Sequence, residues 1–120
     1  MGTMARTVLI VDDHAGFRRA ARALLAAEGF DVVGEAVDGE AALAETRRLR
    51  PDVVLLDIQL PDVDGFAVAD RLAAAPEGPR VILISSREAR EYGGRVEAAA
   101  ALGFIPKALL TGAAIRAIVG

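Results

Sequence analysis

The sequence predicts an α/β fold, a doubly wound parallel sheet of five strands with helices on both faces. Five short apolar runs alternate along the 120 residues with longer stretches in which apolar side chains recur every three or four positions. Strands and helices that alternate in this way form a parallel sheet buried on both faces. With 53% hydrophobic residues and a formal net charge of −3, the chain has the composition of one folded, soluble domain, which excludes a disordered or nucleic-acid-binding tail.

The first three strands are separated by two helices whose ends are marked in the sequence. The first helix has one apolar face and stops before Gly29. Asp38 can cap the second helix, Glu40 favours its first turn, and Pro51 marks its end. The expected strands span residues 8–11, 31–36 and 53–56, and the expected helices span residues 15–27 and 38–49.

The second half of the chain continues the alternation. A helix with an apolar face follows the loop that contains Pro61, and a helix is expected at residues 88–102 although Gly93 and Gly94 weaken it. A last helix follows Thr111. The strands between these helices are expected at residues 80–84 and 103–106.

Polar side chains follow four of the five apolar runs, at the edge of the sheet where such folds have their functional crevice. Asp12 and Asp13 follow the first run, and Asp57 follows the third. Ser85 follows the fourth run and Lys107 the fifth. Because the carboxyl ends of parallel strands meet at one edge, we expect these side chains to converge.

Three carboxylates at one place need a compensating cation. Two carboxylates about 4 Å apart repel by roughly 4 kcal/mol at an effective dielectric near 20, so either their pKa values rise or a cation lies among them. Asp12, Asp13 and Asp57 are therefore interpreted as a partial Mg²⁺ site with positions open for a phosphoryl oxygen. Lys107 is the only lysine among 14 basic residues, which indicates that this position requires a compact ammonium and not a guanidinium. The alternative interpretation is that the single lysine lies there by chance.

Four motifs carry a resemblance that covers nearly the whole chain. They are "VLIVDDH" at 8–14, "LLDIQLPDVDG" at 55–65, "VILISS" at 81–86 and "GFIPK" at 103–107. Together they resemble the receiver domain of bacterial two-component response regulators. The stretch "DDHAGFRRA" is most similar to the subfamily whose receivers precede a helix-turn-helix DNA-binding domain. The resemblance implies a flavodoxin-like fold with strand order 2-1-3-4-5, a receiver domain at residues 6–120 and a loose N-terminal extension at residues 1–5.

The resemblance also implies a phosphoacceptor and a metal site. The residue that matches the phosphoacceptor is Asp57, which would take a phosphoryl group from a phosphohistidine on a sensor histidine kinase or a phosphotransfer protein. Asp13 and Asp57 would ligate Mg²⁺ directly, Asp12 would assist through water, and the backbone carbonyl of Gln59 would complete the protein ligands.

The same resemblance assigns the catalytic and switch residues. Lys107 would contact the phosphoryl oxygens, the hydroxyl of Ser85 would move to bind the new phosphate, and Phe104 would rotate inward as the switch aromatic. Phosphorylation would change the face formed by the fourth helix, fifth strand and fifth helix for partner binding. The chain would not be a conventional enzyme, but would have intrinsic Mg²⁺-dependent phosphotransfer and autodephosphorylation activity.

Several of these residues have simpler interpretations. Ser85 and Glu88 fit a helix-capping box, and Phe104 can be plain core. Asp12 or Asp13 can cap the first helix, although that role needs only one of them. His14, the only histidine, is expected at a surface loop position and not as a metal ligand. Asp62 and Asp64 are interpreted as turn residues, with Asp64 as a helix cap.

Two other function classes are weighed against the switched receiver. A pseudo-receiver would bind its partner without phosphorylation. A phosphohydrolase of the haloacid-dehalogenase kind also uses an aspartate nucleophile, but it needs a second aspartate where this chain has Gln59, so this class is the least favoured.

The expected partners are a kinase and a downstream protein, or an output domain that has been removed or lost. No membrane segment and no direct nucleic-acid contact are expected, and the default location is the cytoplasm. The absence of cysteine excludes disulfides and thiolate metal sites. Small apolar side chains on the last helix suit either a homodimer or a core helix.

Overall fold

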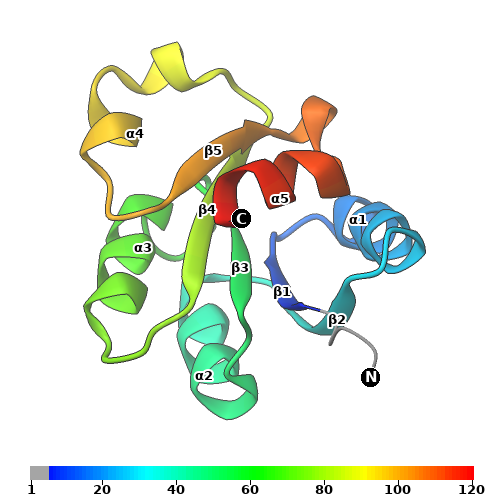
Figure 1. The fold of residues 1–120 in the computed structure, drawn as a ribbon. Coiled ribbons are helices and arrows are strands. Elements are labelled where there is room, and N and C mark those ends of the chain that lie inside the picture. Colours follow the sequence, from blue (N-terminus) through cyan, green and yellow to red (C-terminus); the bar gives the residue numbers. More distant parts are fainter. Residues whose placement is uncertain (1–5) are drawn as a thin grey trace.

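A five-stranded parallel sheet forms the centre of the structure, with its strands in the order β2-β1-β3-β4-β5 (Figure 1). The computed structural model describes residues 6–120, so the extension expected at residues 1–5 lies outside the described residues. This strand order confirms the predicted fold class. The strands are β1 (Thr7–Val11), β2 (Asp31–Ala36), β3 (Val53–Asp57), β4 (Arg80–Ser85) and β5 (Gly103–Pro106).

Helices cover both faces of the sheet, and alternate side chains of the central strands divide the core in two. Val8, Ile10, Val53 and Leu55 face α1 and α5, whereas the intervening residues of β1 and β3 face α2, α3 and α4. Both faces of these strands are therefore buried, as their uninterrupted apolar sequence predicts. The α-helices are α1 (Ala15–Ala27), α2 (Gly39–Leu49), α3 (Gly65–Ala74), α4 (Arg95–Ala98) and α5 (Gly112–Val119).

Most of the helix ends lie where the sequence indicates. The side chain of Asp38 accepts a hydrogen bond from Ala41 N at 2.8 Å and caps α2. Thr111 caps α5 in the same way. The helix α1 ends at Ala27, and Gly29 then adopts a φ of +90°, a conformation that favours glycine.

The prediction of one continuous helix at residues 88–102 is wrong. This stretch forms a 3₁₀ turn, η1 (Ala89–Tyr92), and the single short helix α4, with bends after it. Gly93 interrupts the backbone with a φ of +63°, and Gly94 adds a second residue of low helix propensity. The two glycines thus outweigh the helical pattern around them.

The strand register brings the polar residues to one edge. Val11 pairs with Leu56, Asp57 with Ile84, and Ser85 with Pro106. The residues that end or follow β1, β3, β4 and β5 therefore lie side by side at the carboxyl-terminal edge of the sheet. A further 3₁₀ turn, η2 (Lys107–Leu109), begins directly after β5.

Candidate functional site

Side chains from three strand ends meet at the carboxyl-terminal edge of the sheet. Asp12 and Asp57 are almost fully buried there, and Lys107 reaches them from the end of β5. The Lys107 Nζ atom donates to Asp57 Oδ2 at 3.2 Å and forms an ion pair with Asp12 Oδ2. The convergence expected from the strand pattern is thus present for these three residues.

Four ionisable side chains form one cluster around Asp57. Asp12, Asp13, His14 and Asp57 each offer a ligand atom, and these atoms all lie within 4.8 Å of one another. The His14 Nδ1 atom is 3.0 Å from one oxygen of Asp12 and 3.0 Å from one of Asp13. His14 is exposed, as expected of a surface position, but its ring lies against the carboxylates, a contact that nothing in the sequence indicates.

The cluster perturbs the titration of Asp57 and Lys107. Burial raises the pKa of Asp57, against the lowering effects of the Gln59 backbone N–H and the Lys107 charge. Burial by itself would lower the pKa of Lys107, but its contacts with Asp12 and Asp57 outweigh burial, and the pKa is raised. The ammonium is therefore held in its charged form, while the carboxylate of Asp57 is held in a site that opposes its charge.

The loop after β3 holds one oxygen of Asp57. Gln59 N donates to Asp57 Oδ1 at 3.0 Å, and Gln59 forms an isolated antiparallel bridge with Asp64. Gly65 packs so closely on this loop that a Cβ atom there would lie 2.6 Å from the backbone oxygen of Asp57. Gly65 is thus needed for the close approach of α3 to the loop.

Two aspartates of the same loop serve helix ends. Asp64 accepts a hydrogen bond from Phe66 N at 2.8 Å and caps α3, as predicted. Asp62, interpreted from the sequence as a turn residue only, accepts from Gly39 N and Glu40 N and so joins the loop to the start of α2. This role was missed because the two segments are far apart in the sequence.

Ser85 is fully buried, and its hydroxyl makes its hydrogen bonds with Arg87 and Tyr92. It accepts a hydrogen bond from Arg87 N at 3.0 Å and lies 2.6 Å from the hydroxyl of Tyr92. The capping box expected between Ser85 and Glu88 is not formed, because the box in this stretch joins Glu88 to Glu91. The partner of Ser85 is therefore Tyr92, which no motif in the sequence pairs with it.

Phe104 lies half-buried on the apolar cluster beneath α3 and α4, together with Tyr92 and Val96. This position suits a core residue and also leaves part of the ring at the surface.

Two residues of α1 support the site and were not assigned to it from the sequence. The Lys107 ammonium lies 4.6 Å from the centre of the Phe17 ring, a cation–π contact. Arg18 donates to the backbone oxygen of Asp12 at 2.7 Å and pairs with Glu35. Phe17 fits the apolar face of α1, so its helical spacing alone could not reveal the contact with Lys107.

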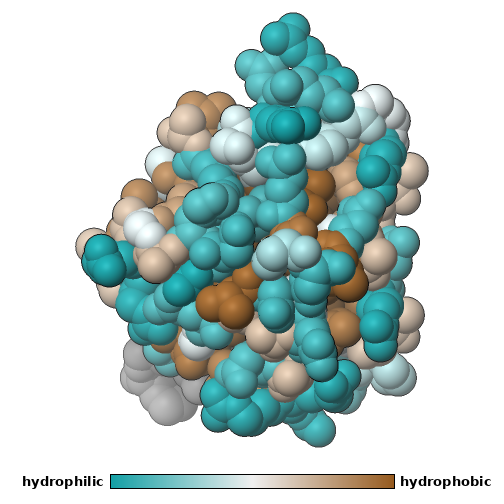
Figure 2. Space-filling model, turned by 180° about the vertical axis from the view of Figure 1, so that it is seen from behind, coloured by the Kyte–Doolittle hydropathy of each residue, from teal (hydrophilic) through white to brown (hydrophobic). Residues whose placement is uncertain are grey.

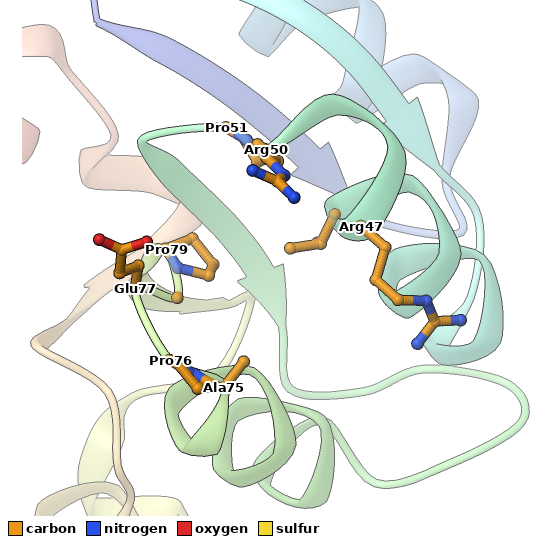
Figure 3. Close-up of a pocket in the computed structure, with 9 residues that line it drawn as sticks. Arg47, Arg50, Pro51, Ala75, Pro76, Glu77 and Pro79 are labelled. Atoms are coloured by element: carbon orange, nitrogen blue, oxygen red, sulfur yellow. The ribbon is translucent and has the colours of Figure 1, made fainter.

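A surface cavity lies away from the candidate site. A cavity of about 500 Å³ lies between the end of α2 and the loop from α3 to β4, at the opposite edge of the sheet. In Figure 3, Arg47 and Arg50 lie on its α2 side, and Glu77 lies across from them. Its position, far from the strand ends that carry Asp57, separates it from the candidate site.

The side of the molecule opposite to the view of Figure 1 has a largely hydrophilic surface. Figure 2 shows that side mostly covered by hydrophilic residues, with apolar side chains in separate areas. Within residues 6–120, no helix is both long and apolar enough to cross a membrane.

Comparisons with known proteins agree with this geometry. The family model of the response regulator receiver domain matches residues 8–119. A transcriptional regulator of Pseudomonas aeruginosa is 39% identical over 100 residues, which are 83% of this chain and 48% of that protein. The chain thus spans about half the length of this relative.

Solved structures extend the similarity to the whole fold. The signal receiver domain of the response regulator NarL from Mycobacterium tuberculosis is 35% identical, with a TM-score of 0.84 over 98% of this chain and 99% of that one. A chain of the CheX–CheY complex with BeF₃ and Mg²⁺ from Borrelia burgdorferi is 29% identical, with a TM-score of 0.81 over 95% and 86%. The predicted resemblance to receivers of transcriptional regulators is confirmed, and this chain belongs to the response regulator receiver domain family.

Proposed function

We propose that this chain is a phosphorylation-switched signalling receiver whose phosphoacceptor is Asp57. The observation that carries the proposal is the meeting of the only lysine of the chain with two buried carboxylates at the strand ends, with Lys107 Nζ 3.2 Å from Asp57 Oδ2. Such a group of charges costs stability in a core, so its presence favours a chemical role.

The residues present fit a Mg²⁺ ion. Asp12, Asp13 and Asp57 provide the carboxylate oxygens that this ion prefers, and their ligand atoms lie within 4.8 Å of one another. Asp13 and Asp57 would hold the ion directly, Asp12 through water, and Gln59 through its backbone carbonyl. The bound ion would supply positive charge beside the phosphoryl oxygens.

The chain's own residues would carry the transfer as follows. Asp57 Oδ1 accepts from the backbone Gln59 N and Oδ2 accepts from Lys107; because the flexible Lys107 side chain can shift its ammonium to the phosphoryl oxygens, we assign Oδ2 as the nucleophile. Oδ2 forms a bond to the phosphorus while the bond from phosphorus to the donor's imidazole nitrogen breaks and leaves its electron pair on that nitrogen. Lys107 donates to the phosphoryl oxygens and stabilises their charge during transfer. Attack of water on the same phosphorus would later break its bond to Oδ2, release inorganic phosphate and restore the carboxylate.

The acyl phosphate would then act as a signal. It adds negative charge and hydrogen-bond acceptors beside Ser85 and Lys107, and this change would bias the packing of the α4-β5-α5 face, which includes Phe104. A sensor histidine kinase or a phosphotransfer protein would supply the phosphoryl group in the cytoplasm. A downstream protein, an output domain of the same protein or a second copy would read the altered face.

The test is the intact mass of the protein after incubation with acetyl phosphate and Mg²⁺. One added phosphoryl group is expected in the wild type and none in Asp57→Asn or in excess chelator. Asp31→Asn is the matched control, since it removes the same charge from an exposed residue at the other end of the sheet. If the folded wild type gains no mass and does not bind beryllofluoride with Mg²⁺, the switch is refuted and a constitutive interaction module remains.

A further inference from the structure

The hydrogen bond between Ser85 and Tyr92 is not explained by the transfer reaction. Ser85 ends β4 beside Asp57, on the strand that pairs directly with β3. Its hydroxyl nevertheless makes its two hydrogen bonds within the segment that follows β4, to Arg87 N and to the Tyr92 hydroxyl. At 2.6 Å, the contact with Tyr92 is the shorter of the two.

Tyr92 is held in place by contacts with α3. Its ring packs edge-on against the buried ring of Phe66, with the centroids 5.7 Å apart at 75°. Arg95 covers Phe66 at 4.4 Å and pairs with Asp64, the residue that caps α3. Tyr92 therefore links the end of β4 to the start of α3.

The segment that carries Tyr92 lies at the surface and contacts the core through partly buried side chains, Tyr92 and Val96 among them. It comprises η1 and α4, which have no buried residues, separated by the exposed Gly93 and Gly94. In Figure 1 this segment, drawn in yellow and yellow-orange, leaves the end of β4 and passes to the side of the sheet that α3 covers. A change at the Tyr92 hydroxyl can thus alter the segment without disturbing the sheet.

We propose that Tyr92 is a lock on Ser85, and that the phosphoryl group on Asp57 must break the Ser85–Tyr92 hydrogen bond to recruit the serine hydroxyl. This inference rests on the proposed function, because it names how the same site is regulated. The Ser85 oxygen contacts both Arg87 N and the Tyr92 hydroxyl, and a side chain holds one rotamer at a time, so turning Ser85 to the phosphoryl oxygens breaks both contacts. Recruitment of Ser85 therefore releases Tyr92, and release of Tyr92 frees the η1–α4 segment.

The coupling must act in both directions. If the phosphoryl group weakens the Ser85–Tyr92 bond, then loss of that bond must strengthen the binding of the phosphoryl group by the same factor. Tyr92→Phe removes only the hydroxyl and keeps the ring against Phe66. It is expected to raise the affinity for beryllofluoride, a phosphoryl mimic, about fivefold in the presence of Mg²⁺, which corresponds to one hydrogen bond of about 1 kcal/mol.

Tyr92 can be observed directly, because it is the only tyrosine and the chain has no tryptophan. Beryllofluoride with Mg²⁺ is expected to change the tyrosine emission of the wild type as the hydroxyl loses its partner. The change should be absent from Ser85→Ala, in which the partner is already missing. Ser86→Ala is the matched control, since this neighbouring serine is exposed, and it should behave as the wild type does.

A double-mutant cycle tests whether Tyr92 acts through Ser85. The expected fivefold gain from Tyr92→Phe should vanish in the Ser85→Ala background, whereas a general effect of Tyr92→Phe on folding would persist there. The lock is overturned if Tyr92→Phe changes the affinity by less than twofold or lowers it while the wild type binds beryllofluoride and gains a phosphoryl group. If the wild type does neither, the proposed function has failed, and the lock fails with it.

Discussion

Asp57→Asn is expected to stabilise the protein when no divalent cation is present. In the metal-free site, the carboxylate of Asp57 is buried among two others and has one ammonium near it. At 4.8 Å, the largest separation within the cluster, each neighbouring carboxylate repels Asp57 by about 3.5 kcal/mol at an effective dielectric near 20. The share of Asp13 is smaller, because about a third of its side chain is exposed to solvent.

The attraction of Lys107 roughly cancels this repulsion. At 3.2 Å the same expression gives about 5 kcal/mol for the pair. What remains is the cost of burying the charge of Asp57, which is 2% exposed. Asparagine keeps the oxygen that accepts from Gln59 N and loses the charge. We therefore expect Asp57→Asn to raise the free energy of unfolding by about 1–2 kcal/mol, or the melting midpoint by about 4–8 °C.

Thermal and urea unfolding followed by circular dichroism, in a chelating buffer, measures this difference. Addition of Mg²⁺ should stabilise the wild type more than Asp57→Asn, because a cation that binds only the folded state adds stability according to its affinity. The difference between the two proteins should therefore shrink or reverse. A metal-free Asp57→Asn that is less stable than the wild type would refute the charge balance, provided that the Asp31→Asn control is unchanged within about 0.5 kcal/mol.

Three further substitutions or conditions test the site. Lys107→Gln leaves two buried carboxylates without their cation, so it should cost about 2–4 kcal/mol of unfolding free energy in chelating buffer and regain part of it with Mg²⁺; a loss below about 0.5 kcal/mol would contradict this. Because burial raises the pKa of Asp57 above its unfolded value, the folded state binds that proton more tightly. Without metal, the free energy of unfolding of Asp57→Asn should therefore exceed that of the wild type by a margin that grows as pH rises from about 4 through the folded pKa. A margin that stays constant across this pH range in unfolding experiments would contradict the raised pKa. Gly65→Ala would place a Cβ 2.6 Å from the backbone of the Asp57 loop, so it should cost about 1–3 kcal/mol and weaken Mg²⁺ binding in calorimetry. Gly16→Ala in α1, with open space around it, should be neutral or stabilising in the same assays.

The sheet and the edge that carries the site follow from the sequence because they depend on local patterns. The run from Val53 to Leu56 is apolar without interruption, and only a strand buried on both faces accounts for it in a chain of alternating strands and helices. Once the strands are parallel, the residues after them must share one edge. Asp12, Asp57 and Lys107 could therefore be grouped without any knowledge of the tertiary structure.

What the sequence could not predict are contacts between side chains of distant segments. Nothing in the spacing of Phe17 pairs it with Lys107, and nothing near Ser85 indicates that its hydroxyl turns to Tyr92. The helix at residues 88–102 failed for a related reason. Its alanines and charged residues suit a helix locally. However, Gly93 and Gly94 interrupt the helix, and the packing of Tyr92 against Phe66 of α3 fixes the path of the chain instead.

The site thus combines charges whose attraction and repulsion nearly cancel with a neighbouring segment that has no fully buried residue, and a switch needs both properties. When attraction and repulsion nearly cancel, the addition of one charged group, such as a phosphoryl group, changes which contacts the charged side chains favour. That change stays local unless a nearby element has two arrangements of similar free energy. The Ser85–Tyr92 hydrogen bond provides the connection, because it joins the buried end of β4 to the η1–α4 segment. A Tyr92→Phe protein should accordingly keep its phosphoacceptor chemistry while its segment responds less to phosphorylation, which hydrogen exchange of the amides at residues 87–99 would measure.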